Sequence, residues 1–173
     1  MFHKLFNSIF TTGCFPEAWR SSTLTPLHKK GSMHEPGNYR GIAIGSSISK
    51  LFCSILQNRL SLYVKEKNII PQNQIGYRAQ SRTSDHVLSL KTLIDTYVNR
   101  LGKTSYLFTC FVDFKSAFDT ISRRYLFYKL LKLGIGGNFL NILQNMYSKV
   151  LYLIKLPGGL TDPVTSNIGV KQG

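Results

Sequence analysis

Acidic residues are scarce in this 173-residue sequence, where 8 Asp and Glu stand against 22 Lys and Arg, for a formal net charge of +14. An excess of this size is unlike a near-neutral enzyme and favours a polyanionic partner, with nucleic acid ahead of a membrane surface. A basic surface that only keeps the protein soluble also explains the charge. The choice between the two therefore depends on finding a site.

Cysteine and histidine are also few. Cys14, Cys53 and Cys110 are odd in number, far apart and set among apolar residues. We therefore expect reduced core thiols of an intracellular protein, with nucleus and cytoplasm both open. The four histidines show no ligand spacing, so no structural zinc is expected.

No apolar run approaches the roughly 20 residues of a membrane span, so we expect no membrane partner. The opening "MFHKLFNSIFTTGC" places apolar side chains at helical spacing between polar residues. This pattern predicts an amphipathic helix of the domain rather than a secretory signal.

The chain has enough apolar material, 43% hydrophobic and 12% aromatic residues, for the core of one domain. Periodicity and turn signals predict a series of helices and strands. The first is a strand pair, Ser22 to Leu27 and Tyr39 to Ile44, around a basic loop. Helices are predicted from Ser47 to about Lys67, from near Ser84 with Thr83 or Ser84 as its cap, from 122 to 133 and from 138 to 149. The last is a hairpin of "LYLIKL" and "VTSNIGV". The apolar run "SYLFTCFV" before Asp113 predicts a strand covered on both faces.

The stretch "FVDFKSAFDTIS", residues 111 to 122, places Asp113 at the end of that predicted strand. A carboxylate in this position can ligate Mg²⁺, and two such ions about 3.5 to 4 Å apart stabilise an in-line phosphoryl displacement. The strand pattern alone favours a residue that caps the next turn. Asp119 precedes "TISRRYLF", where a helix N-terminus favours a carboxylate, so we assign it to structure.

Beyond this motif, a larger pattern resembles the reverse transcriptase domain of non-LTR (LINE-type) retrotransposons. "FVDFKSAFDTIS" resembles the first catalytic motif of that family. "LTPLHKKG" with "NYRGIAI" resembles its fingers strands, and "NQIGYRAQSRTSDHV" resembles its next block. "KLGIGGNFLNILQNMY" resembles the palm helices, and the final "GVKQG" the opening of the following block. Order and spacing agree over nearly the whole chain.

The resemblance implies an α+β fold, a partial right-hand polymerase with fingers and an incomplete palm, whose helices pack on a small sheet. It implies one partial domain over 1–173, fingers-like at 1–104 and incomplete palm at 105–173. The family activity is RNA-directed DNA polymerisation by two-metal nucleotidyl transfer. The implied cofactors are two Mg²⁺ ions, with Mn²⁺ as an alternative. The implied partners are an RNA template, a DNA primer and a dNTP, and the oligomeric state stays open.

The resemblance also assigns roles around the first motif. Asp113 would be a catalytic, metal-binding carboxylate, with the backbone carbonyl of Phe114 as a neighbouring ligand. Phe118 occupies the position of the sugar gate that rejects a 2′-hydroxyl, with Ala117 beside it. The alternative for Phe118 is a core phenylalanine.

Basic residues match the other binding positions of the family. Lys29 or Lys30 and Arg40 would hold the triphosphate, which suits a mobile ammonium and a fixed guanidinium fork. Their alternative is a solvated basic loop that merely attracts RNA. Arg78 and Arg82 would clamp the template backbone, or are ordinary exposed cations. Gln172 matches a glutamine near the templating base pair.

The sequence departs from the family in one serious respect, the absence of any Asp-Asp pair. After Asp119 the only acidic residue is Asp162, next to a proline in a turn sequence. A smaller departure is Gly41, where the family often has proline. We therefore predict that the isolated chain is inactive. We also predict that the hairpin and the strand before Asp113 lose their expected sheet neighbour, which exposes apolar surface and favours aggregation.

Three interpretations remain. The first is the N-terminal part of an RNA-directed DNA polymerase, either an excised fragment or a truncated element copy. The second is a non-catalytic basic remnant that binds RNA or an RNA–DNA duplex. The third is an interaction protein whose exposed helices pair with a polypeptide that supplies the missing palm.

Overall fold

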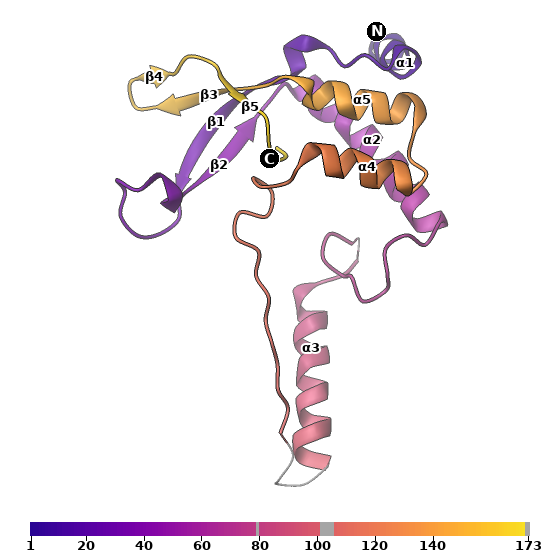
Figure 1. Ribbon diagram of the computed structural model, residues 1–173, viewed down its shortest axis with the longest axis vertical. Coiled ribbons are helices and arrows are strands. Elements are labelled where there is room, and N and C mark those ends of the chain that lie inside the picture. Colours follow the sequence, from indigo (N-terminus) through magenta and orange to yellow (C-terminus); the bar gives the residue numbers. More distant parts are fainter. Residues whose placement is uncertain (79, 101–105, 172–173) are drawn as a thin grey trace. The chain divides into compact units, whose positions relative to one another are not determined.

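The computed structural model describes residues 1–78, 80–100 and 106–171 (Figure 1). Two compact units divide the chain. The first combines Met1–Leu60 with Lys115–Gly173, and the second is Ser61–Phe114. The expected mixture of helices with a small sheet is present.

The first unit contains a five-stranded sheet in the order β2-β1-β3-β4, with β5 also paired to β3. Its strands are β1 (Ser21–His28), β2 (Tyr39–Ile44), β3 (Val150–Leu156), β4 (Gly159–Leu160) and β5 (Val164–Ser166). β1 is antiparallel to β2 and parallel to β3, and β3 is antiparallel to β4 and β5. This confirms the predicted strand pair and C-terminal hairpin. The parallel pairing joins segments that lie more than a hundred residues apart in the chain.

Four helices belong to this unit and gather at one end of the strands (Figure 1). They are α1 (Phe2–Thr12), α2 (Ser47–Glu66, which runs past the division at Leu60), α4 (Arg123–Lys132) and α5 (Gly137–Ser148). Short 3₁₀ helices occur at η1 (Glu17–Trp19) and η2 (Pro36–Asn38). All four predicted helices are therefore confirmed.

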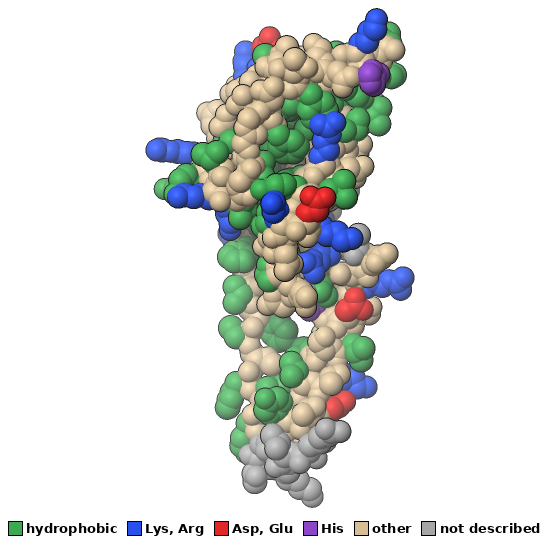
Figure 2. All heavy atoms as spheres, turned by 90° about the vertical axis from the view of Figure 1, so that its right-hand side faces the viewer, with side chains coloured by type: hydrophobic (Ala, Val, Ile, Leu, Met, Phe, Trp, Pro, Cys, Tyr) green, Lys and Arg blue, Asp and Glu red, His purple; other side chains and the backbone are tan. Residues whose placement is uncertain are grey.

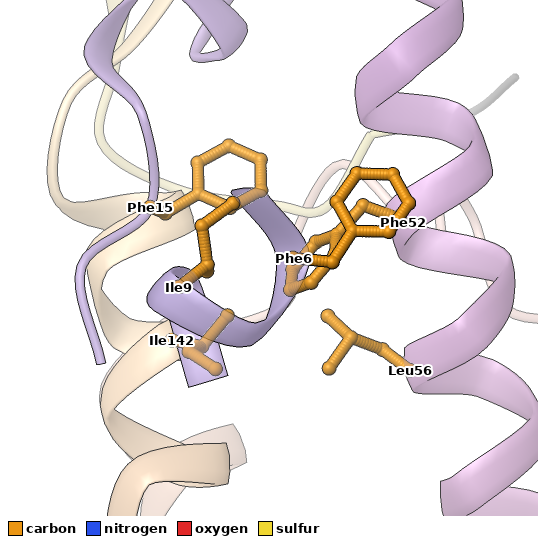
Figure 3. Close-up of a cluster of buried hydrophobic side chains, with 6 residues drawn as sticks. All are labelled: Phe6, Ile9, Phe15, Phe52, Leu56 and Ile142. Carbon is orange, nitrogen blue, oxygen red and sulfur yellow. The ribbon is translucent and has the colours of Figure 1, made fainter. Parts of the chain in front are cut away.

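The core of the first unit is a cluster of apolar side chains from α1, α2 and α5, together with Phe15 from the segment after α1 (Figure 3). Phe52 is fully buried at its centre, with the rings of Phe6 and Phe10 at 5.3 and 5.2 Å between centroids. α1 ends at Gly13, whose φ of 72° is the left-handed conformation that favours glycine at a helix C-terminus. Asn138 of α5 donates to the carbonyls of Phe10 and Thr11 at this end of α1.

The second unit contains α3 (Thr83–Ile94), continued by a π-helical turn, η3 (Asp95–Arg100). The predicted helix is confirmed, but its predicted cap is wrong because Arg82 occupies the N-cap position. An arginine side chain cannot accept a hydrogen bond there. Instead, the Asp85 carboxylate accepts one from the Arg82 backbone N–H at 2.8 Å.

The predicted strand before Asp113 is wrong over the residues that the structure describes. Residues 106–114 form no strand, and Phe108 and Phe114 are 93% and 77% exposed. A strand needs a partner for its backbone N–H and C=O groups. The five strands of the described chain pair only with one another, so none is available here. Apolar side chains of this unit accordingly lie at the surface (Figure 2).

The cysteines are free, but the expectation that all three lie in the core is wrong. Cys14 and Cys110 are exposed, and Cys53 is half-buried. Cys14 directly follows the turn at Gly13, and Cys110 lies in the segment that finds no sheet partner. Within the described ranges, no helix combines the length and apolar character needed to cross a membrane.

Candidate nucleotide and nucleic-acid site

Asp113 and Phe114 close the second unit, and both are exposed. Because the predicted strand is missing, regular backbone pairing does not hold the Asp113 carboxylate. The described residues contain no group of three or more His, Cys, Asp or Glu able to hold a metal ion. A two-metal centre needs several oxygen ligands. The donors present therefore do not fit such a centre, and Asp113 supplies a single carboxylate.

Ala117 and Phe118 lie in the first unit, in a turn over residues 115–120. The Ser116 carbonyl closes this turn by accepting hydrogen bonds from the backbone N–H groups of Asp119 and Thr120, at 3.0 and 3.1 Å. Phe118 is 38% exposed, so its ring is not a fully buried core side chain. Its assignment as a sugar gate stays a prediction.

The same turn pairs with the C-terminal block "GVKQG". The Gly169 N–H donates to the Ile121 carbonyl at 2.8 Å, and the Val170 N–H donates to the Phe118 carbonyl at 2.9 Å. Gly169 has φ +77°, and a Cβ there would meet the Asp119 carbonyl oxygen at 2.6 Å. Only glycine fits this approach. Gln172 lies outside the described residues.

The N-cap position of the helix that follows Asp119 is occupied by Ser122, and the structural role assigned to Asp119 stays a prediction. This helix, α4, begins at Arg123. Asp119 lies in the preceding turn, where its backbone approaches Gly169. Its negative charge also contributes to a raised pKa of Tyr152, although burial of that hydroxyl is the larger cause.

Arg123 holds the last strand and the segment after it against α4. Its guanidinium donates to the Gly169 carbonyl at 2.8 Å, to the Ser166 carbonyl and hydroxyl at 2.7 and 3.0 Å, to the Ile168 carbonyl at 3.1 Å and to the Tyr147 carbonyl at 3.3 Å. It also lies 5.2 Å from the centre of the Tyr147 ring. These contacts satisfy several backbone carbonyls with one planar, charged donor.

Our sequence interpretation missed Arg123, although a signal was available. Arg123 and Arg124 begin α4, and its first turn has no acidic residue. The positive end of the helix dipole disfavours cations in that position. A pair of arginines there therefore indicates that tertiary contacts or a partner offset the cost.

Lys171, two residues after Gly169, is anchored from the opposite side. Its ammonium donates to the Ser22 hydroxyl at 2.9 Å and to the Arg20 carbonyl at 3.1 Å, both beside the start of β1. Ser22 is buried. The chain leading to Gln172 is thus fixed between β1 and α4 by two cations that sequence reasoning did not single out.

Burial governs the titration of this region. It lowers the pKa of Lys171, because a half-buried ammonium loses hydration. It raises the pKa of Cys53 and of Tyr147, whose charged forms are anions. Within the Cys53 and Lys171 pair, the opposite charges partly offset burial at each group.

The three predicted triphosphate residues lie at the same end of the β1–β2 pair. Lys29 follows the last residue of β1, and its N–H donates to the Asn38 carbonyl at 2.8 Å. Arg40 on β2 lies opposite Leu27. Lys29, Lys30 and Arg40 are all exposed. The strand register therefore brings these cations together at a solvent-facing tip.

The two predicted template residues differ in their surroundings. Arg78 is half-buried, and its guanidinium donates to the Ile70 carbonyl at 2.9 Å. This hydrogen bond links the two ends of the segment from Ile70 to Arg78. Arg82 is exposed and precedes α3. Both belong to the second unit, and their contact with template stays a prediction.

Comparison with known proteins identifies the class of this chain. Residues 27–173 match the model of the family described as "Reverse transcriptase (RNA-dependent DNA polymerase)". The match covers most of the chain, so the chain belongs to the reverse transcriptase family. This confirms the resemblance drawn from its motifs.

The relatives are proteins of transposable elements. The chain is 28% identical over 171 residues to "Probable RNA-directed DNA polymerase from transposon BS" of Drosophila melanogaster, which covers 98% of this chain and 18% of that protein. It is 28% identical over 170 residues to "RNA-directed DNA polymerase from mobile element jockey" of the same species, and this match covers 98% of this chain and 18% of that protein. It is 30% identical over 164 residues to "Retrovirus-related Pol polyprotein from type-1 retrotransposable element R2" of Popillia japonica, and this match covers 93% of this chain and 22% of that protein. The chain thus spans about a fifth of the length of these relatives.

Proposed function

We propose that this chain is the fingers and incomplete palm of a non-LTR retrotransposon polymerase that copies RNA into DNA. The observation that carries the proposal is the pairing of "GVKQG" with the "SAFDTI" turn through Gly169 and Val170. Two motifs that resemble neighbouring parts of a nucleotide site, about fifty residues apart in sequence, lie side by side. The family match supports the same function.

In this proposal the tip of the β1–β2 pair binds the triphosphate. Lys29 or Lys30 would supply a mobile charge and Arg40 a planar fork for phosphate oxygens. Phe118, beside Ala117 in the paired turn, would exclude a 2′-hydroxyl from the incoming nucleotide. Arg78 and Arg82 would contact the template backbone, with Gln172 near the templating base pair. The corresponding partners are an RNA template, a DNA primer and a dNTP.

Reverse transcriptases normally depend on a divalent metal, and Asp113 is the residue we assign as its ligand, with the Phe114 carbonyl beside it. The described donors do not complete a two-metal centre. The chain contains no Asp-Asp pair that would add the missing carboxylates. We therefore place catalysis in the complete polymerase domain and not in this chain alone.

The decisive experiment reads the transcript beyond the codon for Gly173 and expresses the continued frame. A following apolar strand with Asp-Asp, together with primer extension on an RNA template that Asp113→Asn abolishes, is the expected result. Asp162→Asn, which removes an exposed carboxylate outside the proposed site, serves as the matched control and should retain extension. A stop codon directly after Gly173, or extension that survives Asp113→Asn, would contradict the proposal.

One observation favours a second candidate function, a non-catalytic module that binds RNA or an RNA–DNA duplex. The basic tip of the β1–β2 pair is exposed, and no carboxylate cluster accompanies it among the described residues. Binding whose logarithm falls steeply with the logarithm of salt concentration, unchanged by Asp113→Ala, distinguishes this function from catalysis.

A further inference from the structure

From the exposed face of α4, we infer a docking surface for single-stranded RNA that is separate from the residues assigned to nucleotide binding. The surface, called here the α4 face, consists of Arg124, Tyr125, Tyr128, Lys129 and Lys132, all exposed. The choice of RNA rests on the proposed function. The existence of the surface rests on the geometry and charge of α4 itself.

Helical spacing places these side chains together. Arg124, Tyr128 and Lys132 are four residues apart and follow one line along the helix, and Tyr125 and Lys129 form a second line beside it. The ammonium of Lys132 lies 5.6 Å from the centre of the Tyr128 ring. The opposite side of α4 is occupied by internal packing, as shown by the Phe127 and Tyr147 rings, whose centroids are 6.5 Å apart.

The charge of this region fits a polyanion. From Thr120 to Thr161 the sequence has no acidic residue, whereas it has six Lys and Arg, three of them on the α4 face. Arg124 and Lys129 form no ion pair with any described carboxylate. Arg124 also lies in the first helical turn, where the helix dipole disfavours a cation. A bound phosphate would offset both the repulsion between these cations and the dipole cost.

The tyrosines select the kind of nucleic acid. Tyr125 and Tyr128 are 73% and 58% exposed, which leaves two large rings in water with little packing to stabilise them. Exposed aromatic rings between cations are how proteins bind single strands, since unpaired bases stack on rings while cations contact the backbone. In a duplex, the bases are paired and stacked on one another. The surface therefore fits single-stranded RNA better than duplex.

The test measures binding of a fluorescently labelled, mixed-sequence 12-nucleotide RNA to the full chain by anisotropy between 50 and 300 mM KCl. Tyr125→Ala with Tyr128→Ala should weaken binding at least about tenfold, as expected for two lost stacking contacts. Tyr125→Phe with Tyr128→Phe should restore it, because the rings remain. Arg124→Gln, Lys129→Gln and Lys132→Gln together should reduce the slope of log affinity against log salt by about two, the counterion release expected for three single-strand contacts.

Matched controls separate the α4 face from general basicity. Lys4→Gln, Lys50→Gln and Lys155→Gln remove the same charge from exposed positions elsewhere in the first unit, and Tyr77→Ala with Tyr106→Ala removes two exposed rings from the second unit. Equal losses in control and α4 variants, full affinity in the alanine pair, tighter binding of duplex RNA, or no RNA binding at 50 mM KCl would each overturn the inference. None of these outcomes bears on the Asp113 test of the polymerase function.

Discussion

At the scale of single residues, Arg123 is the side chain that anchors Ser166, Ile168 and Gly169 to the start of α4. We expect Arg123→Ala to lower the free energy of unfolding by about 2 to 4 kcal/mol, because it removes a charged donor from the part-buried carbonyls of Gly169, Tyr147 and Ser166. Urea denaturation measures this loss. Amide exchange at Gly169 and Val170 should also become faster, because the Arg123 guanidinium no longer holds the Gly169 carbonyl beside their backbone hydrogen bonds.

Two further variants make this prediction specific. Arg123→Lys keeps the charge but not the planar fork, so it should recover only part of the lost stability. Arg124→Ala, at the exposed neighbouring position, should change stability by no more than about 0.5 kcal/mol. Equal effects of the two alanine variants would show that Arg123 has no special role in holding the segment.

Lys171 gives a prediction for pH dependence. Burial lowers its folded pKa below the ordinary value of 10.5, so between these two values the unfolded chain binds more protons than the folded one. Stability from this group therefore rises with pH across that window. The parent should gain unfolding free energy relative to Lys171→Met as pH increases towards 10.5.

Urea titrations of both proteins at several pH values test this difference. Taking the difference largely removes the effects of Tyr147 and Tyr152, whose raised pKa values make stability fall as pH rises above 10.0. Lys155→Met, at an exposed lysine of β3, is the control for replacing a lysine by methionine. A constant difference between parent and Lys171→Met would contradict the prediction.

At the scale of elements, the segment before Asp113 behaves differently from its sequence pattern. Phe108→Ser with Phe111→Ser should change the free energy of unfolding by less than about 0.5 kcal/mol, because both rings are exposed. In a buried strand the same changes would cost several kcal/mol. Denaturation of the double variant measures this directly, and Phe52→Ala, in the core, is the contrast at about 3 to 5 kcal/mol lost.

Limited digestion with chymotrypsin provides an independent measurement of the same element. Cleavage after Phe108 and Phe111 should precede cleavage after Phe52, because α2 must open before its core ring becomes accessible. Protection of the 106–114 segment equal to that of α2 would mean that the segment is packed.

The helices were predicted correctly because the spacing of their apolar residues matches the side of each helix that is buried. Phe6 and Ile9 of α1, and Phe52 and Leu56 of α2, repeat at helical spacing and are the residues that are buried. "SYLFTCFV" has an equally strong apolar pattern, but a strand also depends on a partner that local sequence does not reveal. Similarly, the roles of Arg123 and Lys171 depend on carbonyls at Gly169 and Arg20, far away in sequence.

At the scale of the whole molecule, the structure contains two compact units. The division into fingers at 1–104 and incomplete palm at 105–173 is a functional one, which these units do not test, so it stays a prediction. Asp113 belongs to one unit, whereas Phe118 and the β1–β2 tip belong to the other. The resemblance to the family could assign roles to Asp113, Phe118 and the β1–β2 tip, because the motifs occur in the same order in this chain. It could not place the metal ligand beside the nucleotide-binding residues, since that placement depends on a strand that lacks a partner.

The isolated chain is therefore expected to lack catalytic activity. We expect no primer extension on an RNA template with Mg²⁺ or Mn²⁺, because Asp113 is a single carboxylate and the described residues offer no ligand cluster. RNA binding should persist, since the excess of 22 Lys and Arg over 8 Asp and Glu attracts a polyanion without a metal site. Gel analysis of a labelled primer, with anisotropy on the same RNA, measures both properties. Extension that disappears in Asp113→Asn while RNA affinity is unchanged would show that this chain's own groups complete the site.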